Sequence, residues 1–395
     1  MNIVKDISMF LFIFSIYNDN LTVDFVGGTV FKIMQLQFLI IHAKDIYIAF
    51  SMHKNRVVKS FLIFFAILFT IISLTEVIYF NNILLKSIPL FLTIVAIYIY
   101  FSYYDNLEKV LYMIWAVMII SAIYSLFAPT VNPWTFRRSG GTVDPNEYSM
   151  QLLTVIFFTI YLYIKNKNII FLLGSLGLFF YSLLFAGSKS SILVLGIVSL
   201  YAIIVKFDFV VKKILSLKGL IGIIIVIAIL FSYNFSSIKA VSGMEERAHS
   251  TGTMHQRFMA WKAGSEMIRD NFLLGTGFDS FAKSSVNYLD KYLSQYDGLA
   301  AHNIFVKLFA ETGVFPFIAF IVALIYLFTT NFTQILRSDY FWLSLAAYAT
   351  ILMGMTLSLI YNKFFWFPLA FLTYATMITS MTQDQKDKEI DGKIS

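Results

Sequence analysis

The chain has 395 residues, of which 58% are hydrophobic and only 13% are charged. Soluble domains are roughly half apolar and about a quarter charged, so this balance excludes an ordinary soluble domain. The mean hydropathy of +0.75 agrees, and the composition indicates an all-α integral membrane protein.

The formal net charge is +7 and cysteine is absent. A basic membrane protein places its lysines and arginines beside anionic lipid headgroups, so the charge is no argument for nucleic acid as a partner. Without cysteine there is neither a disulfide framework nor a thiolate metal site.

Apolar runs of about 20 residues can cross a hydrocarbon core of roughly 30 Å as helices. We predict about twelve such spans, near residues 10–17, 30–50, 61–80, 88–103, 111–127, 148–164, 169–185, 191–205, 220–231, 304–327, 340–360 and 364–381. This divides the chain into nine spans in residues 1–231, one large, partly helical outer loop at 232–302, three spans in 303–381, and a disordered tail at 382–395. The first span is short, and we interpret it as an uncleaved anchor because no small-residue cleavage site follows.

The distribution of cations in the short connections predicts the orientation, because lysine and arginine collect on the cytoplasmic side. One alternating set of loops holds Lys54, Arg56, Lys59, Lys165, Lys167, Lys206, Lys212, Lys213, Lys218 and Arg337. We therefore expect a multi-pass membrane protein with both termini in the cytoplasm. The 232–302 loop and the loop around Arg137 then lie outside.

The outer loop at residues 136–148 places Arg137 and Arg138 beside a glycine turn and Asn146. An arginine at the bilayer edge raises the free energy unless it binds an anion, and outside it also opposes the usual charge bias. We expect an anion at Arg137, with Arg138 sharing or exchanging that role. The alternative is an arginine that reaches lipid phosphates. Asn146 either caps the following span or binds sugar.

The large outer loop contains a predicted helix at 256–270 that lies along the membrane surface or caps a cavity. Arg257 begins it and Trp261 lies on its apolar face; Arg257 could instead pair with Glu245 or Glu246. The glycines at 275 and 277 indicate a tight turn more than a phosphate loop. Residues 301–303 lead into the next span.

Four motifs, in order, resemble those of bacterial O-antigen polymerases and O-antigen ligases over about residues 137–330. They are Arg137-x-x-Gly140 followed by Asp144-Pro145-Asn146, the Gly187-Ser188-Lys189-Ser190 turn, the stretch 257–281 with Trp261, Gly275 and Gly277, and His302-Asn303 with Glu311 and Gly313. Lys189 departs from the arginine that is usual in the family.

The resemblance implies a transferase without metal or cofactor, which moves an oligosaccharide from undecaprenyl pyrophosphate to an acceptor hydroxyl on the outer face. The leaving group is a stable anion, so charge stabilisation matters more than a proton donor, and guanidinium groups fit phosphates bidentately. His302 would be the general base for the acceptor; the plain alternative is a histidine at a helix start. The expected catalytic residues are His302, Arg137 and Arg257, and the expected substrate-binding residues are Arg138, Asn146, Lys189, Asn303 and Trp261.

Four further residues have structural interpretations. Glu311 lies nine residues after His302, on the opposite helix face, so a pair with Lys307 is the simpler expectation. His42 is expected to line a polar seam or to hydrogen-bond between helices. Trp342 and Trp366, like Trp134, are interpreted as residues of the interfacial aromatic belt.

The leading hypothesis is a polymerase that joins lipid-linked repeat units of an O-antigen or capsule-like glycan. Its expected partners are the undecaprenyl-pyrophosphate-linked oligosaccharide, membrane lipids and a chain-length regulator. The nearest alternative is an O-antigen ligase that delivers the chain to lipid A core. An alternative of another class is a flippase or transporter for lipid-linked glycans, which inverted repeats and interrupted helices would favour.

Overall fold

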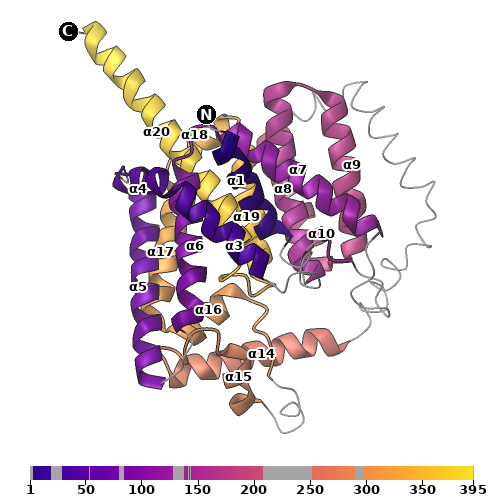
Figure 1. Ribbon diagram of the computed structural model, residues 1–395, viewed down its shortest axis with the longest axis vertical. Helices are drawn as coiled ribbons and strands as arrows, with labels where there is room; N and C mark the ends of the chain where they lie inside the picture. The colour runs from indigo at the N-terminus through magenta and orange to yellow at the C-terminus, as the bar shows by residue number, and fades with distance from the viewer. Residues whose placement is uncertain are drawn as a thin grey trace. The chain divides into compact units, whose positions relative to one another are not determined.

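The computed structural model describes residues 3–18, 29–52, 54–79, 84–127, 138–140, 142, 144–207, 251–289 and 298–394. All regular elements in these ranges are helices, which confirms the predicted all-α class (Figure 1). The α-helices are α1 (Ile3–Tyr17), α3 (Thr29–Ile41), α4 (Ala43–Ser51), α5 (Arg56–Tyr79), α6 (Leu84–Ser102), α7 (Leu107–Phe127), α8 (Pro145–Asn166), α9 (Ile169–Ala186), α10 (Lys189–Val205), α14 (Thr251–Asp270), α15 (Phe281–Ser285), α16 (Ile304–Thr312), α17 (Val314–Thr329), α18 (Phe332–Arg337), α19 (Phe341–Gly354) and α20 (Trp366–Ile394). Short 3-10 turns follow α15 (Val286–Tyr288) and precede α20 (Lys363–Phe365).

Among the described residues, five helical stretches are long and apolar enough to cross a membrane, or six if α3 and α4 form one broken span. The five are Arg56–Ile78, Leu107–Phe127, Pro145–Asn166, Ile169–Ala186 and Lys363–Met381. Four shorter apolar helices accompany them, at Ser87–Ser102, Lys189–Val205, Val314–Thr329 and Phe341–Gly354. A multi-pass membrane protein is thus supported, but the expected count of about twelve spans is not confirmed. The predicted span at 220–231 lies outside the described residues.

Two predicted spans are interrupted in the structure. The stretch 30–50 forms two helices, separated at His42. The stretch 304–327 forms α16 and α17, separated at Gly313, whose φ of 78° is accessible mainly to glycine. Mean hydropathy over a run of about 20 residues does not reveal a single residue that leaves the helical region. The last helix also continues to Ile394, through the tail that the sequence predicts to be disordered.

The first of two compact units comprises Met1–Ile41, Asn106–Thr251 and Phe341–Met353. In it α7, α8 and α9 pack against one another, and α1 packs against α3 and α7. The α8 helix is the most enclosed of the candidate spans, because 83% of its apolar window is buried. This central helix carries the Asn146 motif at its N-terminus.

The second unit comprises His42–Asp105, Gly252–Tyr340 and Gly354–Ser395. In it α5 packs along α17, and α20 packs along α6. Trp366 lies at the centre, 1% exposed, with its ring against those of Phe64, Phe65 and Phe320. The aromatic-belt interpretation is therefore wrong for Trp366, and also for Trp342, which is 5% exposed.

Interhelical hydrogen bonds also hold the second unit together. Tyr98 and Thr373 join α6 to α20 through their hydroxyl oxygens, 2.6 Å apart. The expectation for His42 is confirmed, because its Nδ1 lies 3.1 Å from the Tyr100 hydroxyl on α6. Such bonds satisfy polar groups that lipid cannot.

Candidate functional site

Arg138 neutralises the end of a helix in the first unit. Its Nη1 donates to the carbonyl oxygens of Ser125, at 2.7 Å, and Leu126, both in the last turn of α7. Its guanidinium carbon also lies 4.8 Å from the ring centre of Phe185. The C-terminus of a helix has a partial negative charge, which a cation stabilises. Arg138 thus has a structural role, whereas Arg137 lies outside the described residues and its role stays a prediction.

Asp144, not Asn146, caps α8. The Asp144 Oδ1 accepts hydrogen bonds from the Asn146 backbone nitrogen at 2.7 Å and from its side-chain Nδ2 at 2.9 Å. Pro145 occupies the first helical position, where its missing N–H is harmless. The capping alternative for Asn146 is therefore wrong, and its sugar-binding role stays a prediction.

A chain of serine hydroxyls joins the Asn146 motif to the Lys189 turn. Ser149 donates to the Asn146 carbonyl at 2.8 Å, and its Oγ lies 2.6 Å from that of Ser191. Ser191 in turn donates to Ser188 at 3.0 Å. The starts of α8 and α10 therefore lie side by side, and two of the predicted substrate-binding residues share one end of this unit.

Lys189 is the first residue of α10, and its side chain is exposed. A helix N-terminus has a partial positive charge, so a cation there is unfavourable unless an anion accompanies it. The helix dipole therefore does not favour a lysine here, and the contact of Lys189 with substrate stays a prediction.

In the second unit, α14 confirms the helix predicted at 256–270 and places Trp261 against the His302 turn. The Trp261 Nε1 donates to the carbonyl oxygen of Ala301 at 3.0 Å, and the side chain remains 38% exposed. The helix also approaches α16 closely, because a Cβ on Gly264 would lie 2.5 Å from the Val306 Cγ1. Arg257 lies one turn before Trp261 and is half-buried.

His302 has left-handed backbone geometry immediately before α16, with φ of 47°. This conformation is uncommon outside glycine and costs about 1–3 kcal/mol, so the surrounding structure must impose it. Asn303 next to it caps α16, because its Oδ1 accepts from the backbone nitrogens of Phe305 at 2.9 Å and Val306 at 3.2 Å. The substrate-binding role of Asn303 stays a prediction, and its side-chain Oδ1 already caps α16.

The other end of α16 carries a buried ion pair. Glu311 is fully buried and Lys307 is 12% exposed, and Lys307 Nζ lies 3.2 Å from Glu311 Oε1. The predicted pair is thus confirmed. Lys307 also contacts Asp279 at 2.9 Å, and Glu311 accepts from the Phe281 backbone nitrogen at 2.9 Å and the Tyr361 hydroxyl at 2.8 Å.

Burial and charge oppose each other in this network, which lies outside the candidate spans. Burial raises the pKa of Glu311, and Lys307 with the two hydrogen-bond donors only partly offsets that rise. Burial also lowers the pKa of Lys307, but the carboxylates of Glu311 and Asp279 outweigh it, so the net pKa is raised. The fold therefore favours the charged ammonium and disfavours the bare carboxylate.

The glycine turn after α14 packs backbone to backbone against the end of α16. Thr276 and Gly277 donate their N–H groups to the carbonyls of Ala310 and Glu311, each at 2.9 Å. Gly275 has φ of 71°, and a Cβ there would lie 2.3 Å from the Glu311 carbonyl carbon. The turn interpretation is confirmed, and close backbone approach explains the glycine at 275.

Sequence reasoning missed Asp279 and Tyr361. Neither has a local signal, because Tyr361 follows Glu311 by 50 residues and Asp279 lies on an exposed turn. In the part of the chain that the structure describes, no group of three or more His, Asp or Glu side chains could hold a metal ion.

Comparison with known families finds that residues 174–321 match the family model of the O-antigen ligases. The match confirms the resemblance and indicates a glycosyl-transferring enzyme of O-antigen assembly in the membrane. No curated protein matches the chain significantly. The matched range includes the predicted site residues Lys189, Arg257, Trp261, His302 and Asn303.

Proposed function

We propose that the protein is a polymerase of an O-antigen or capsule-like glycan. It transfers the growing chain from undecaprenyl pyrophosphate to a new lipid-linked repeat unit on the outer face of the bacterial inner membrane. The family match supports glycosyl transfer. The observation that carries the proposal is the His302 turn, which has left-handed geometry and is tied to α14 by Trp261.

The proposed reaction needs a base and a cation. The acceptor hydroxyl oxygen attacks the anomeric carbon, His302 takes the hydroxyl proton, and the bond from that carbon to the phosphate oxygen breaks. The pyrophosphate leaves on its lipid as an anion, so no proton donor is required. Arg257 would stabilise the phosphate charge. Arg137, which lies outside the described residues, would do the same.

The geometry around His302 suits this role. Asn303 completes the first turn of α16 without using the imidazole, and the helix N-terminus favours negative charge nearby. The indole N–H of Trp261 fixes the preceding carbonyl, while its partly exposed ring can stack on a sugar. Trp261 is thus a positioning residue for His302 as well as a candidate sugar contact.

The second candidate function is an O-antigen ligase, which the description of the matched family favours. Donor chemistry would be the same, and only the acceptor would differ. A lipid A core acceptor would replace the lipid-linked repeat unit.

The test uses the purified full chain in vesicles with undecaprenyl-pyrophosphate-linked repeat units. A ladder of longer glycans supports the polymerase, and extension of an added lipid A core supports the ligase. Movement of the lipid without a new glycosidic bond would support a flippase and contradict both transferase proposals.

A matched pair of histidine variants tests the base. We expect His302→Ala to lose about 100-fold or more in rate, the usual range for general-base catalysis. His255→Ala, at an exposed position on α14, should retain the wild-type rate. If His302→Ala keeps full activity with an unchanged pH profile, the imidazole is structural.

A further inference from the structure

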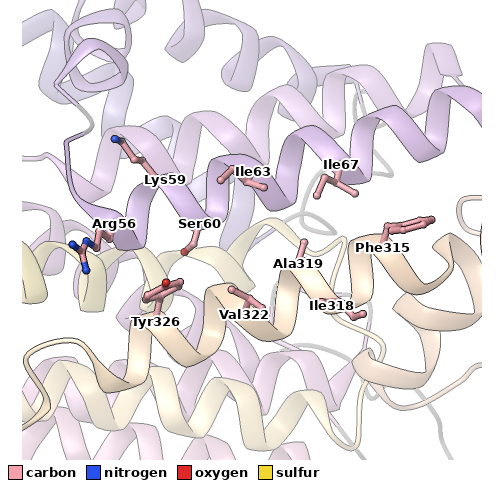
Figure 2. Close-up of a pocket in the computed structure, with 10 residues that line it drawn as sticks. All are labelled: Arg56, Lys59, Ser60, Ile63, Ile67, Phe315, Ile318, Ala319, Val322 and Tyr326. Atoms are coloured by element: carbon pink, nitrogen blue, oxygen red, sulfur yellow. The ribbon is translucent and has the colours of Figure 1, made fainter.

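A groove of about 470 Å³ runs between α5 and α17 in the second unit (Figure 2). The residues that line it are Arg56, Lys59, Ser60, Ile63, Ile67, Phe315, Ile318, Ala319, Val322 and Tyr326. None of them belongs to the site described above. Beneath the groove, Phe64 and Phe320 close the contact between the helices, with ring centres 5.1 Å apart.

The two walls have the same spacing. On each helix the lining residues fall at i, i+3, i+4, i+7 and i+11, starting from Arg56 on α5 and from Phe315 on α17. This spacing forms one continuous stripe along a helix. The small side chains of Ser60 and Ala319 lie where the stripes face each other, and leave the space open (Figure 2).

The groove is polar at one end only. Arg56 and Lys59 lie there, and Tyr326 of α17 lies across from Arg56 (Figure 2). Both cations are exposed, and neither takes part in an ion pair among the described residues. The other end, at Ile67 and Phe315, is entirely apolar. Charge and apolar surface therefore occupy opposite ends.

The length of the groove matches one leaflet of a bilayer. Arg56 and Ile67 are eleven residues apart on α5, which corresponds to about 16 Å of helix. A leaflet contributes half of a hydrocarbon core of roughly 30 Å. A lipid with its phosphate at the cationic end would thus reach the apolar end near the bilayer midplane.

We propose that this groove binds one anionic glycerophospholipid, with its phosphate between Arg56 and Lys59 and one acyl chain along Ile63, Ala319 and Val322. The occupant follows from charge complementarity: two cations require an anionic headgroup, and the apolar remainder requires a chain. The cation distribution predicts that this end of α5 faces the cytoplasm. The site is therefore on the side opposite to the proposed glycan chemistry.

Native mass spectrometry of the full chain in detergent tests the proposal, with phosphatidylglycerol and phosphatidylcholine as the two probes. Wild type should retain phosphatidylglycerol in preference to phosphatidylcholine. The double variant Arg56→Gln/Lys59→Gln should bind phosphatidylglycerol about twenty-five-fold more weakly, given a factor of about five for each cation near a lipid surface.

A matched control removes equal charge elsewhere. Lys165→Gln/Lys167→Gln, at the end of α8 and on the same expected side, should bind phosphatidylglycerol as wild type does. Ala319→Phe keeps both cations and fills the groove, and it should also weaken retention, which tests the site independently of the charge variant.

Three results would overturn the proposal. The first is unchanged phosphatidylglycerol binding in Arg56→Gln/Lys59→Gln. The second is an equal loss in the Lys165→Gln/Lys167→Gln control, which would indicate general charge attraction. The third is tighter binding of undecaprenyl phosphate that the same groove variants abolish, which would assign the groove to the substrate lipid.

Discussion

Replacement of Lys307 by methionine tests the balance of charge and burial in the Glu311 network. Methionine keeps most of the aliphatic stem and removes the ammonium. Glu311 is fully buried and lies 3.2 Å from Lys307 Nζ, which at an effective dielectric of about 20 corresponds to an attraction of about 5 kcal/mol before desolvation. Removing one partner of a buried pair destabilises proteins by about 3–5 kcal/mol, and we expect Lys307→Met to lie in that range at neutral pH.

The loss of stability in Lys307→Met should depend on pH in one definite direction. The pKa of Glu311 is raised in the folded protein, so its contribution to stability is greatest below its unfolded pKa of about 4.3 and decreases as the pH rises through the folded pKa. Lys307→Met removes the positive charge that partly offsets the effect of burial, so the pKa of Glu311 should rise further. The difference in stability between wild type and Lys307→Met should therefore be largest at neutral pH and shrink on acidification.

Thermal unfolding of the detergent-solubilised chain, followed by size-exclusion chromatography at several pH values, measures this difference. The neutral isostere supplies the control. Lys307→Met/Glu311→Gln has no buried carboxylate, and it should recover most of the stability at neutral pH. Wild-type stability in Lys307→Met, or a defect of equal size at acidic and neutral pH, would refute the reasoning.

Two further substitutions follow from packing and capping. Gly275→Ala should prevent folding and abolish membrane-inserted protein on immunoblots, because the new Cβ would lie 2.3 Å from the Glu311 backbone. The control is Gly174→Ala in α9, where the new Cβ would meet no atom within 4 Å and the protein should fold normally. Equal yields of the two variants would contradict the close approach at Gly275. Arg138→Gln should lower thermal stability by about 1–2 kcal/mol, because the carbonyls at the end of α7 lose a charged donor; an unchanged unfolding midpoint would show that the cap contributes nothing.

The sequence predicts most helices well where a long apolar run forms the helix. The predicted ends at residues 127, 169 and 205 coincide with the ends of α7, α9 and α10. These runs are mostly apolar, so few alternative helix boundaries remain. The α14 helix was also predictable, because its apolar residues fall at helical spacing.

The errors have local causes that composition does not encode. The breaks at His42 and Gly313 fall beside short polar stretches within the apolar runs, which include Lys44 and Asp45 in one and Glu311 in the other. Each break also has partners elsewhere in the fold. Trp366 is identical in type to a belt residue, but α5 and α17 enclose it. A tryptophan near the end of an apolar run does not reveal which neighbour will cover it.

The candidate site shows the same division between local and long-range information. The Lys307–Glu311 pair was predictable because residues four apart on a helix face each other. Asp279 and Tyr361 complete the network from segments that no local pattern connects to it. Helical spacing thus predicted the ion pair, and only the tertiary structure showed which residues complete the network around it.

The motif residues also differ in what their polar atoms already do. Asn303 uses its carbonyl oxygen to cap α16, and Arg138 uses Nη1 to cap α7. Glu311 supports the turn that contains Gly275. Loss of glycan synthesis after substitution of these residues would follow equally from loss of the cap or the turn. A substrate-binding role for Asn303 or Arg138 therefore requires a variant that lowers activity while the thermal midpoint stays at the wild-type value.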